Sequence, residues 1–405
     1  MKKASFLLFL LVALPVFSAS VLKQAREALK KRQNLEQAAS NLLAEAAKPT
    51  TSRKNKIECY QLAAECSQRI NDAENMKLYL KQKYDTTKFF STIYDLTQRV
   101  LLADSVGCTP DAKGRVAPVG RKRNRELLLR YRPNMLAGAN WFYRRGQFSQ
   151  AFTFFDTYVA LAHTPILEAD ELEQTDSMLP LAAYLAVISA HGSANPAGVI
   201  RHASLAQKAG QRSEIVQELV VRAWDARGDS AQWEAALWQG LRTYPRHPFF
   251  FTRLIDHLFV KGELDKGMAV ADSMLAVDRR EPLYWYAKSL IYMKQHNDSA
   301  VIAACDSCLA CDSNYVDALY NKGIAALNLA VIQAESACTD LRRAECRRQQ
   351  KAVKDCYRRA LHPMERVRQL QPDSSGRWAP ALYRIYLNLN MGKEFDEMDE
   401  ILNGR

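Results

Sequence analysis

The sequence predicts an all-α fold in which helical hairpins stack into an α-solenoid, preceded by a divergent helical N-terminal region. Apolar residues recur at three- and four-residue steps over long segments, the spacing of one helix face. Glycine accounts for 16 of 405 residues and proline for 14, too few for a chain dominated by loops. Gly228, Gly262 and His296 follow one another at steps of 34 residues, each where a turn between paired helices is expected.

Residues 1–20 are predicted to be a cleaved secretory signal peptide. Lys2 and Lys3 provide a positive start, Phe6–Leu14 is apolar, and small residues from Ser18 onward offer a cleavage site. The apolar run is too short to span a membrane, which takes about 20 residues. We therefore expect a periplasmic protein without a transmembrane span, and an association with the outer membrane stays open.

The charge of the chain favours anionic partners. The formal net charge is +12, and loss of Lys2 and Lys3 leaves 54 basic against 44 acidic residues, or +10. Nucleic acid is not expected, because an exported protein rarely meets it. Two basic segments, Arg121–Arg132 and Arg342–Arg359, are interpreted either as solvated helix faces or as anion-binding patches.

The N-terminal helical region is predicted over 21–103, without a clear 34-residue period. Its expected helices are Val21–Ala47, Ile57–Ile70, Ala73–Tyr84 and Thr87–Leu102. A linker is predicted over 104–120, because this stretch holds three glycines and two prolines.

The remaining residues, 121–405, are predicted to form the repeat array. Its expected hairpins are Asn134–Leu161, Asp176–Ala209, Glu214–Tyr244, Pro248–Val277 and Leu283–Leu309. A helix from Val316 is followed by an insertion over 335–350 and by a helix that Pro363 is expected to interrupt. A last helix pair, turned near Gly392, is expected to cap the array.

Trp285 and Tyr292 fit the pattern W-x2-L-G-x2-Y, and Gly146–Ala151 has the form of the turn G-x-[FY]-x-x-A. With the 34-residue period, these residues resemble the tetratricopeptide-repeat (TPR) family, and more narrowly exported TPR proteins of Gram-negative bacteria. The resemblance implies a non-enzymatic periplasmic scaffold that binds a peptide, a protein or an envelope component in a concave groove. The alternative is a glycan-binding outer-membrane accessory of the SusD-like type, which is also built from TPRs.

Within that resemblance, five positions of each first helix are implied to line the groove. The candidate binding residues are Glu218, Arg222, Phe249, Asp256, Tyr286, Lys294, Tyr320 and Asn328. They mix aromatic side chains with both signs of charge, which suits a peptide partner.

The nine cysteines are the remaining chemical signal. Cys305, Cys308 and Cys311 have the spacing of some metal clusters, but on a helix they are interpreted mainly as packing residues, with disulfide involvement as an alternative. Cys338 and Cys346 lie in the insertion and are predicted to form a disulfide. The sequence contains no H-E-x-x-H, G-x-S-x-G or Walker A motif. We expect no catalytic residues, no metal and no cofactor.

The first prediction concerns export. Because a positive start, a short apolar run and a small-residue site come in order, about 20 residues should be removed from the native protein. Intact-mass measurement checks this, and a native protein that retains Met1 would rule it out.

Overall fold

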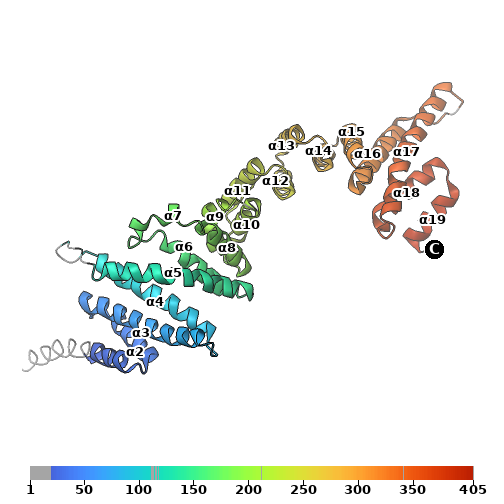
Figure 1. The fold of residues 1–405 in the computed structure, drawn as a ribbon. Helices are drawn as coiled ribbons and strands as arrows, with labels where there is room; N and C mark the ends of the chain where they lie inside the picture. Colours follow the sequence, from blue (N-terminus) through green and yellow to red (C-terminus); the bar gives the residue numbers. More distant parts are fainter. Residues whose placement is uncertain are drawn as a thin grey trace, which may run out of the picture. The chain divides into compact units, whose positions relative to one another are not determined.

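The computed structural model describes residues 20–404, apart from 111–113, 115, 117, 211 and 341. Throughout this part of the chain every regular element is a helix, which confirms the all-α prediction (Figure 1). Contacts divide the chain into two units, Met1–Ala236 and Leu237–Arg405. The predicted signal peptide lies outside the described residues except for Ser20.

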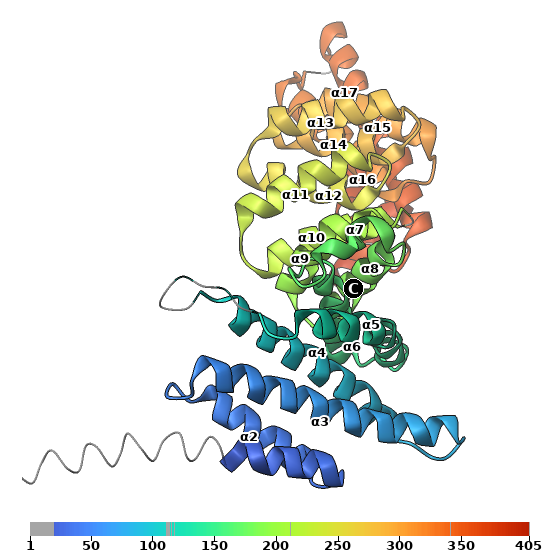
Figure 2. The same cartoon turned by 60° about the vertical axis from the view of Figure 1, so that its left-hand side comes forward.

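Unit 1 begins with a helix over residues 20–31. It continues with α2 (Leu35–Ala47), α3 (Arg53–Tyr79), α4 (Thr86–Cys108), α5 (Arg121–Arg144), α6 (Phe148–Leu161), η1 (Glu168–Asp170), α7 (Leu172–Thr175), α8 (Leu179–Gly192), α9 (Pro196–Gln207), α10 (Ser213–Ala226) and the start of α11 (Ser230–Thr243). Figure 2 shows α2, α3 and α4 packed side by side. One apolar core extends from α3 to α10.

The first predicted helix, Val21–Ala47, is two helices. Arg32 and Asn34 have φ values of 53° and 52°, which end one helix before α2 begins. Asparagine adopts this left-handed conformation more readily than most residues. The two helices then pack face to face through apolar residues that include Leu22, Ala39 and Leu42.

The next two predicted helices, Ile57–Ile70 and Ala73–Tyr84, are in fact the single helix α3. Asn71, which lies between the two predicted ranges, is buried within it. Its Nδ2 donates to the Phe89 carbonyl at 2.8 Å and to Thr92 Oγ1 at 3.1 Å, both on α4. These bonds to the neighbouring helix satisfy the amide, so it does not compete with the helical backbone.

The linker predicted over 104–120 is shorter, because α4 continues to Cys108 and α5 begins at Arg121. The guanidinium of Arg53 donates to the carbonyls of Val106 and Gly107, at 3.1 and 2.7 Å. Carbonyls in the last turn of a helix lack partners within it. Arg53 supplies those partners and extends α4 into the predicted linker.

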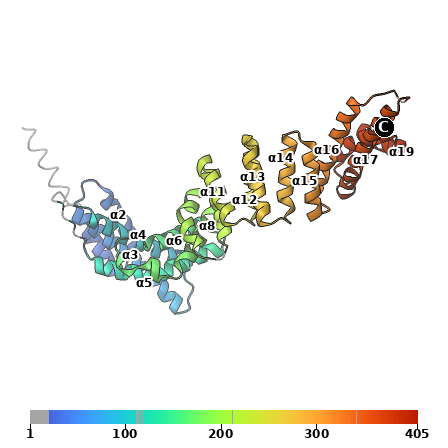
Figure 3. The same cartoon turned by 90° about the horizontal axis from the view of Figure 1, so that it is seen from above.

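Unit 2 consists of the end of α11 followed by α12 (Pro248–Lys261), α13 (Leu264–Val277), α14 (Pro282–Lys294), α15 (Asp298–Cys311), α16 (Val316–Ser336), α17 (Ala344–Leu370), α18 (Ser375–Leu389) and α19 (Gly392–Asn403). In Figures 1 and 3 these helices follow one another as antiparallel pairs. We call the first member of a pair the A helix and the second the B helix. The A helices of unit 2 are α12, α14, α16 and α18.

The helix boundaries confirm the 34-residue repeat. The A helices α12, α14 and α16 begin at residues 248, 282 and 316, and the B helices α11, α13 and α15 begin at 230, 264 and 298. An ion pair also repeats at this step. Lys288 contacts Asp272 at 2.6 Å, and one repeat later Lys322 contacts Asp306 at 2.5 Å. These helix pairs are therefore of the TPR type.

Each of three successive turns contains a residue in the left-handed conformation. The φ values are 69° at Gly228, 73° at Gly262 and 54° at His296. In each turn the next residue donates its N–H to a carbonyl five residues back, as in Asp229 to Trp224, Glu263 to Leu258 and Asn297 to Tyr292. This pattern closes the A helix and reverses the chain.

The pair α16–α17 is longer than its neighbours. The helices α12 and α14 have 14 and 13 residues, whereas α16 has 21 and α17 has 27. We call the additional part, residues 329–356, the extension. It contains the predicted insertion, and it projects from the end of the pair (Figure 1).

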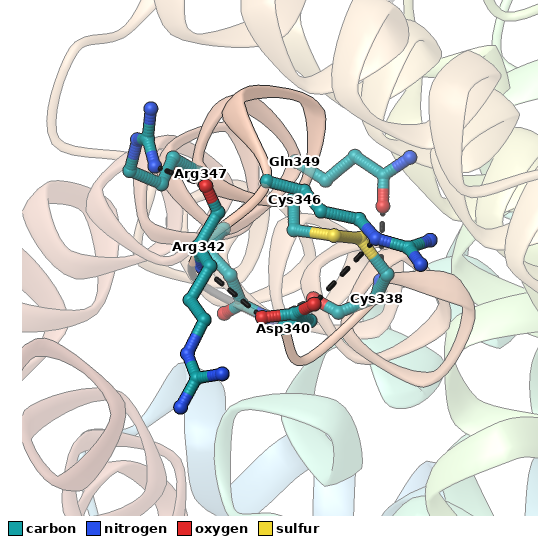
Figure 4. Close-up of a disulfide and its surroundings, with 8 residues drawn as sticks. Cys338, Asp340, Arg342, Cys346, Arg347 and Gln349 are labelled. Atoms are coloured by element: carbon teal, nitrogen blue, oxygen red, sulfur yellow. Dashed lines mark hydrogen bonds and ion pairs between the residues drawn. A yellow bond between two sulfur atoms is a disulfide. The ribbon is translucent and has the colours of Figure 1, made fainter.

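A disulfide joins Cys338 to Cys346 at the tip of the extension, with the two Cα atoms 5.2 Å apart (Figure 4). The backbone N–H of Cys338 donates to Gln349 Oε1 at 2.9 Å, and its carbonyl accepts from Gln350 Nε2 at 3.1 Å. The tip is thus held by one covalent bond and two side-chain hydrogen bonds.

Pro363 does not interrupt the helix that follows the insertion, as the sequence suggested, but lies inside α17. A proline in a helix interior costs about 3 kcal/mol, because it removes one hydrogen bond and crowds the preceding turn. Here Ala360, Met364 and Val367 are fully buried on the same side of α17. Their packing offsets that cost.

The pair α18–α19 follows as the predicted C-terminal pair. Trp378 and Met398 are buried between its helices and α17. Among the described residues, no helix combines the length and the apolar composition needed to cross a bilayer.

The second prediction concerns the disulfide. Replacing Cys338 and Cys346 by Ser should destabilise the extension by about 2–3 kcal/mol, because the unfolded loop is no longer closed. Hydrogen exchange of the amides in residues 344–356 should become faster, while α13 serves as an internal control. Alkylation of both thiols without prior reduction would contradict the bond.

Candidate binding face of the A helices

The predicted binding residues lie in both units. Glu218 and Arg222 belong to α10 of unit 1, where they form an ion pair across one helical turn, with 2.6 Å between Nη2 and Oε1. The other six belong to A helices of unit 2. A pair at this spacing stabilises its own helix by a few tenths of a kcal/mol. The two residues therefore already contribute to the stability of α10.

The most developed part of the face is a group that we call the Tyr286 cluster: Tyr286, Tyr315, Asp317, Tyr320 and Arg377. It brings α14, α16 and α18 together. The rings of Tyr286 and Tyr315 have centroids 5.2 Å apart. The Arg377 guanidinium lies 4.5 Å from the centroid of the Tyr320 ring, and its Nη2 is 2.5 Å from Asp317 Oδ1.

Burial sets the protonation of this cluster. It raises the pKa of Tyr286 to about 12, with a smaller contribution from the negative charge of Asp317. Burial raises the pKa of Tyr315 as well. Both phenols are therefore neutral at physiological pH, and each keeps a hydroxyl group able to donate a hydrogen bond.

The cluster rests on apolar packing that includes Cys305 and Cys308, both fully buried on α15. Burial raises the pKa of Cys305 to about 11 and that of Cys308 to about 12. Such thiols are protonated and act as small apolar groups. Cys311 is exposed instead. Within the described residues, no group of three or more His, Cys, Asp or Glu side chains is arranged to hold a metal ion.

Towards α12 the face continues with separate contacts. Phe249 is half-buried at the start of α12, edge-on to Phe250 with centroids 5.4 Å apart. Lys294 on α14 places Nζ 5.8 Å from the centroid of Phe259 on α12. Asp256 is exposed on the same helix. This region thus offers aromatic edges with one charge of each sign.

Asn328 is exposed, and its Nδ2 donates to Asp298 Oδ1 at 3.1 Å. Asp298 is the first residue of α15, so this contact joins the A helix of one repeat to the B helix of the previous one. Of the predicted set, the structure therefore brings Tyr286 and Tyr320 into one cluster, and it places Asn328 apart from them in an inter-repeat contact.

Asp317 falls on a groove position of the 34-residue frame, whereas Tyr315 and Arg377 do not. Tyr315 is the N-cap of α16 and precedes the positions that were considered. Arg377 is displaced from the 34-residue frame, because α18 begins 59 residues after α16. The sequence carries no periodic signal for Arg377, since the extension lies between the two A helices.

The four described hollows belong to unit 1. The largest, about 1100 Å³, is open and lies between the start of α2, the end of α3 and Lys88. None of the predicted binding residues lines any of the four. The Tyr286 cluster is thus a surface for contact and not a described cavity.

No family model matches the chain, and no curated protein matches it. Among solved structures, the C-terminal part of a TPR repeat-containing protein from Cytophaga hutchinsonii is similar at 10% identity, over 64% of this chain and 91% of that one, with a TM-score of 0.41. A TPR repeats protein from Bacteroides fragilis is similar at 11% identity, over 67% of this chain and 99% of that one, with a TM-score of 0.31. The P58(IPK) TPR domain is similar at 11% identity, over 93% of this chain and 99% of that one, with a TM-score of 0.31.

These three structures are TPR proteins by description, but the TPR-type repeats of this chain rest on its own helix spacing and turns. Stacked repeats of this type leave one helix face of each pair exposed along the array.

The third prediction uses the Tyr286 phenol. Its raised pKa means that the unfolded chain releases this proton near pH 10, whereas the folded chain keeps it until about pH 12. The contribution of this phenol to the free energy of unfolding is present in full below pH 10 and is lost between pH 10 and 12. Tyr286→Phe should make the unfolding free energy fall less steeply over that window in urea titrations.

Tyr79→Phe is the matched control, because the Tyr79 side chain is 82% exposed in the folded chain. It should leave the pH dependence as in the wild type. Identical slopes for Tyr286→Phe and the wild type would contradict the assignment.

Proposed function

We propose that the protein is a non-enzymatic periplasmic adaptor that binds a peptide segment of a partner protein on the A-helix face of unit 2. The observation that carries this proposal is the Tyr286 cluster. It combines three tyrosines with an ion-paired arginine on three successive A helices. Tyrosine and arginine dominate the binding energy of many protein interfaces.

The cluster is also held in place before a partner arrives. Arg377 is fixed on one side by Asp317 and on the other by the Tyr320 ring. The Tyr286 ring is held against Tyr315 and the buried thiols beneath it. Side chains that are already ordered lose less conformational entropy on binding, so more of their contact energy appears as affinity.

The A-helix face carries charges of both signs, which favours a peptide as the partner. Asp256 and Lys294 lie on the same face with opposite signs. A surface of mixed sign matches the mixed side chains of a peptide better than it matches a uniform polyanion. No observation among the described residues specifically supports the alternative, a SusD-like glycan-binding accessory.

The periplasmic location is part of the proposal and is supported by two features. The sequence begins with the three-part pattern of a secretory signal. The disulfide between Cys338 and Cys346 is of the kind that persists in an oxidising compartment.

The fourth prediction tests the face. The triple variant Phe249→Ala, Tyr286→Ala and Tyr320→Ala should lose crosslinked capture of the partner in intact cells. Once the partner is identified by mass spectrometry, its Kd should rise at least about 100-fold, because aromatic hot spots each contribute more than about 1 kcal/mol. Circular dichroism should show that helical content is kept.

A matched control removes exposed apolar side chains elsewhere: Tyr79→Ala, Leu102→Ala and Val277→Ala, which are 82%, 43% and 47% exposed. This control should capture the same partner as the wild type. Undiminished capture by the Phe249, Tyr286 and Tyr320 variant would show that the A-helix face is not the binding site.

A further inference from the structure

The extension and the next turn of α17 carry a concentration of positive charge that peptide binding on the A helices does not use. Between Arg342 and Arg359 there are eight basic and two acidic residues. All eight basic side chains are exposed. In Figure 4 the side chain of Arg342 extends away from the disulfide.

Four of these residues form a line along α17, which we call the basic stripe: Arg347, Lys351, Lys354 and Arg358. At 3.6 residues per turn they fall within an arc of about 60°. The stripe is about 17 Å long at a rise of 1.5 Å per residue. The buried residues Val353 and Cys356 lie on other sides of the helix, packed against the rest of the unit.

Some of the basic residues in this segment form ion pairs with acidic neighbours. Arg358 contacts Asp355 at 2.6 Å, and Arg343 contacts Asp340 at 3.5 Å. Neither Lys351 nor Lys354 forms an ion pair with any residue that the structure describes. The stripe therefore keeps a strong positive potential at the surface.

The extension holds the stripe in a fixed shape. Its tip is closed by the disulfide and by the bonds of Gln349 and Gln350 to Cys338. Lower down, the Cys356 thiol donates to Gln333 Oε1 at 2.8 Å and joins α17 to α16. Without these bonds the tip of this hairpin would open locally, and the basic side chains would no longer be held in one row.

The form of the stripe indicates what it contacts. Its four side chains are exposed, and none of the four described hollows is lined by residues of the extension. A straight row of long, exposed basic side chains is able to meet a flat anionic surface at all four positions at once. A flexible acidic peptide would have to be ordered along the same row.

We propose that the extension docks the protein on an anionic phospholipid bilayer through the basic stripe. The attraction is electrostatic, because the apolar face of α17 is already buried in the unit. Clusters of four to eight Lys and Arg residues on an amphipathic helix are typical of segments that bind anionic lipid. Docking leaves the Tyr286 cluster as a separate site.

The fifth prediction uses vesicles of phosphatidylglycerol and phosphatidylcholine in cosedimentation. The wild-type chain should bind the mixed vesicles, and binding should fall steeply between 50 mM and 500 mM salt (about 14 Å and about 4 Å of screening length). The variant Arg347→Gln, Lys351→Gln and Lys354→Gln should bind roughly 100-fold more weakly, about fivefold for each charge removed. Partition to pure phosphatidylcholine is subtracted throughout.

The matched control, Arg242→Gln, Arg279→Gln and Arg280→Gln, removes the same net charge from exposed positions of unit 2 outside the extension. It should bind within a few-fold of the wild type, and Lys351→Arg with Lys354→Arg should bind as the wild type does. All chains share one N-terminus, so any contribution of residues 1–20 is common to them.

Equal losses in the two glutamine variants would assign binding to the overall charge of the chain and overturn the proposal. Absence of salt-sensitive binding by the wild type would overturn it too. Unchanged vesicle binding by the stripe variant, together with loss of binding to a polyglutamate peptide, would assign the stripe to an acidic protein and reject the membrane.

Discussion

The left-handed turns that end α10, α12 and α14 are the constraint on which the regular repeats of this chain depend. A positive φ in each of these turns lets the chain reverse within a few residues and lay the B helix against the helix just completed. Gly228, Gly262 and His296 meet this requirement at steps of 34 residues. Once the turn is set, each pair has one neighbour on either side, and the apolar faces are buried locally.

The same spacing places polar contacts in register. The pairs Lys288–Asp272 and Lys322–Asp306 each join an A helix to the preceding B helix. Pairs this exposed contribute about 0–1 kcal/mol, so they add little to stability. Their recurrence reflects the fixed geometry of one repeat on the next. That geometry also brings Tyr286, Tyr320 and Arg377 together from three A helices that are far apart in sequence.

The period of the turns was sufficient to predict the fold class and the hairpins of unit 2, because it depends on local backbone chemistry. The sequence also indicated the disulfide, since Cys338 and Cys346 lie close in a short insertion. Errors arose where a tertiary contact overrode a local signal. Asn71 stays helical because α4 supplies its partners, and Pro363 is tolerated because its face of α17 is buried. The Tyr286 cluster was predicted in part, since the extension moves Arg377 out of the periodic frame.

His296 shows how far a repeat is free to change. It stands where two preceding turns have glycine, yet its φ of 54° and the bond from Asn297 to Tyr292 reproduce their backbone. The left-handed conformation costs a residue with a Cβ about 1–2 kcal/mol. A comparison by residue identity scores this position as a mismatch, although the chain path is the same. A repeat of this kind therefore requires the sign of φ at the turn and not a particular residue there.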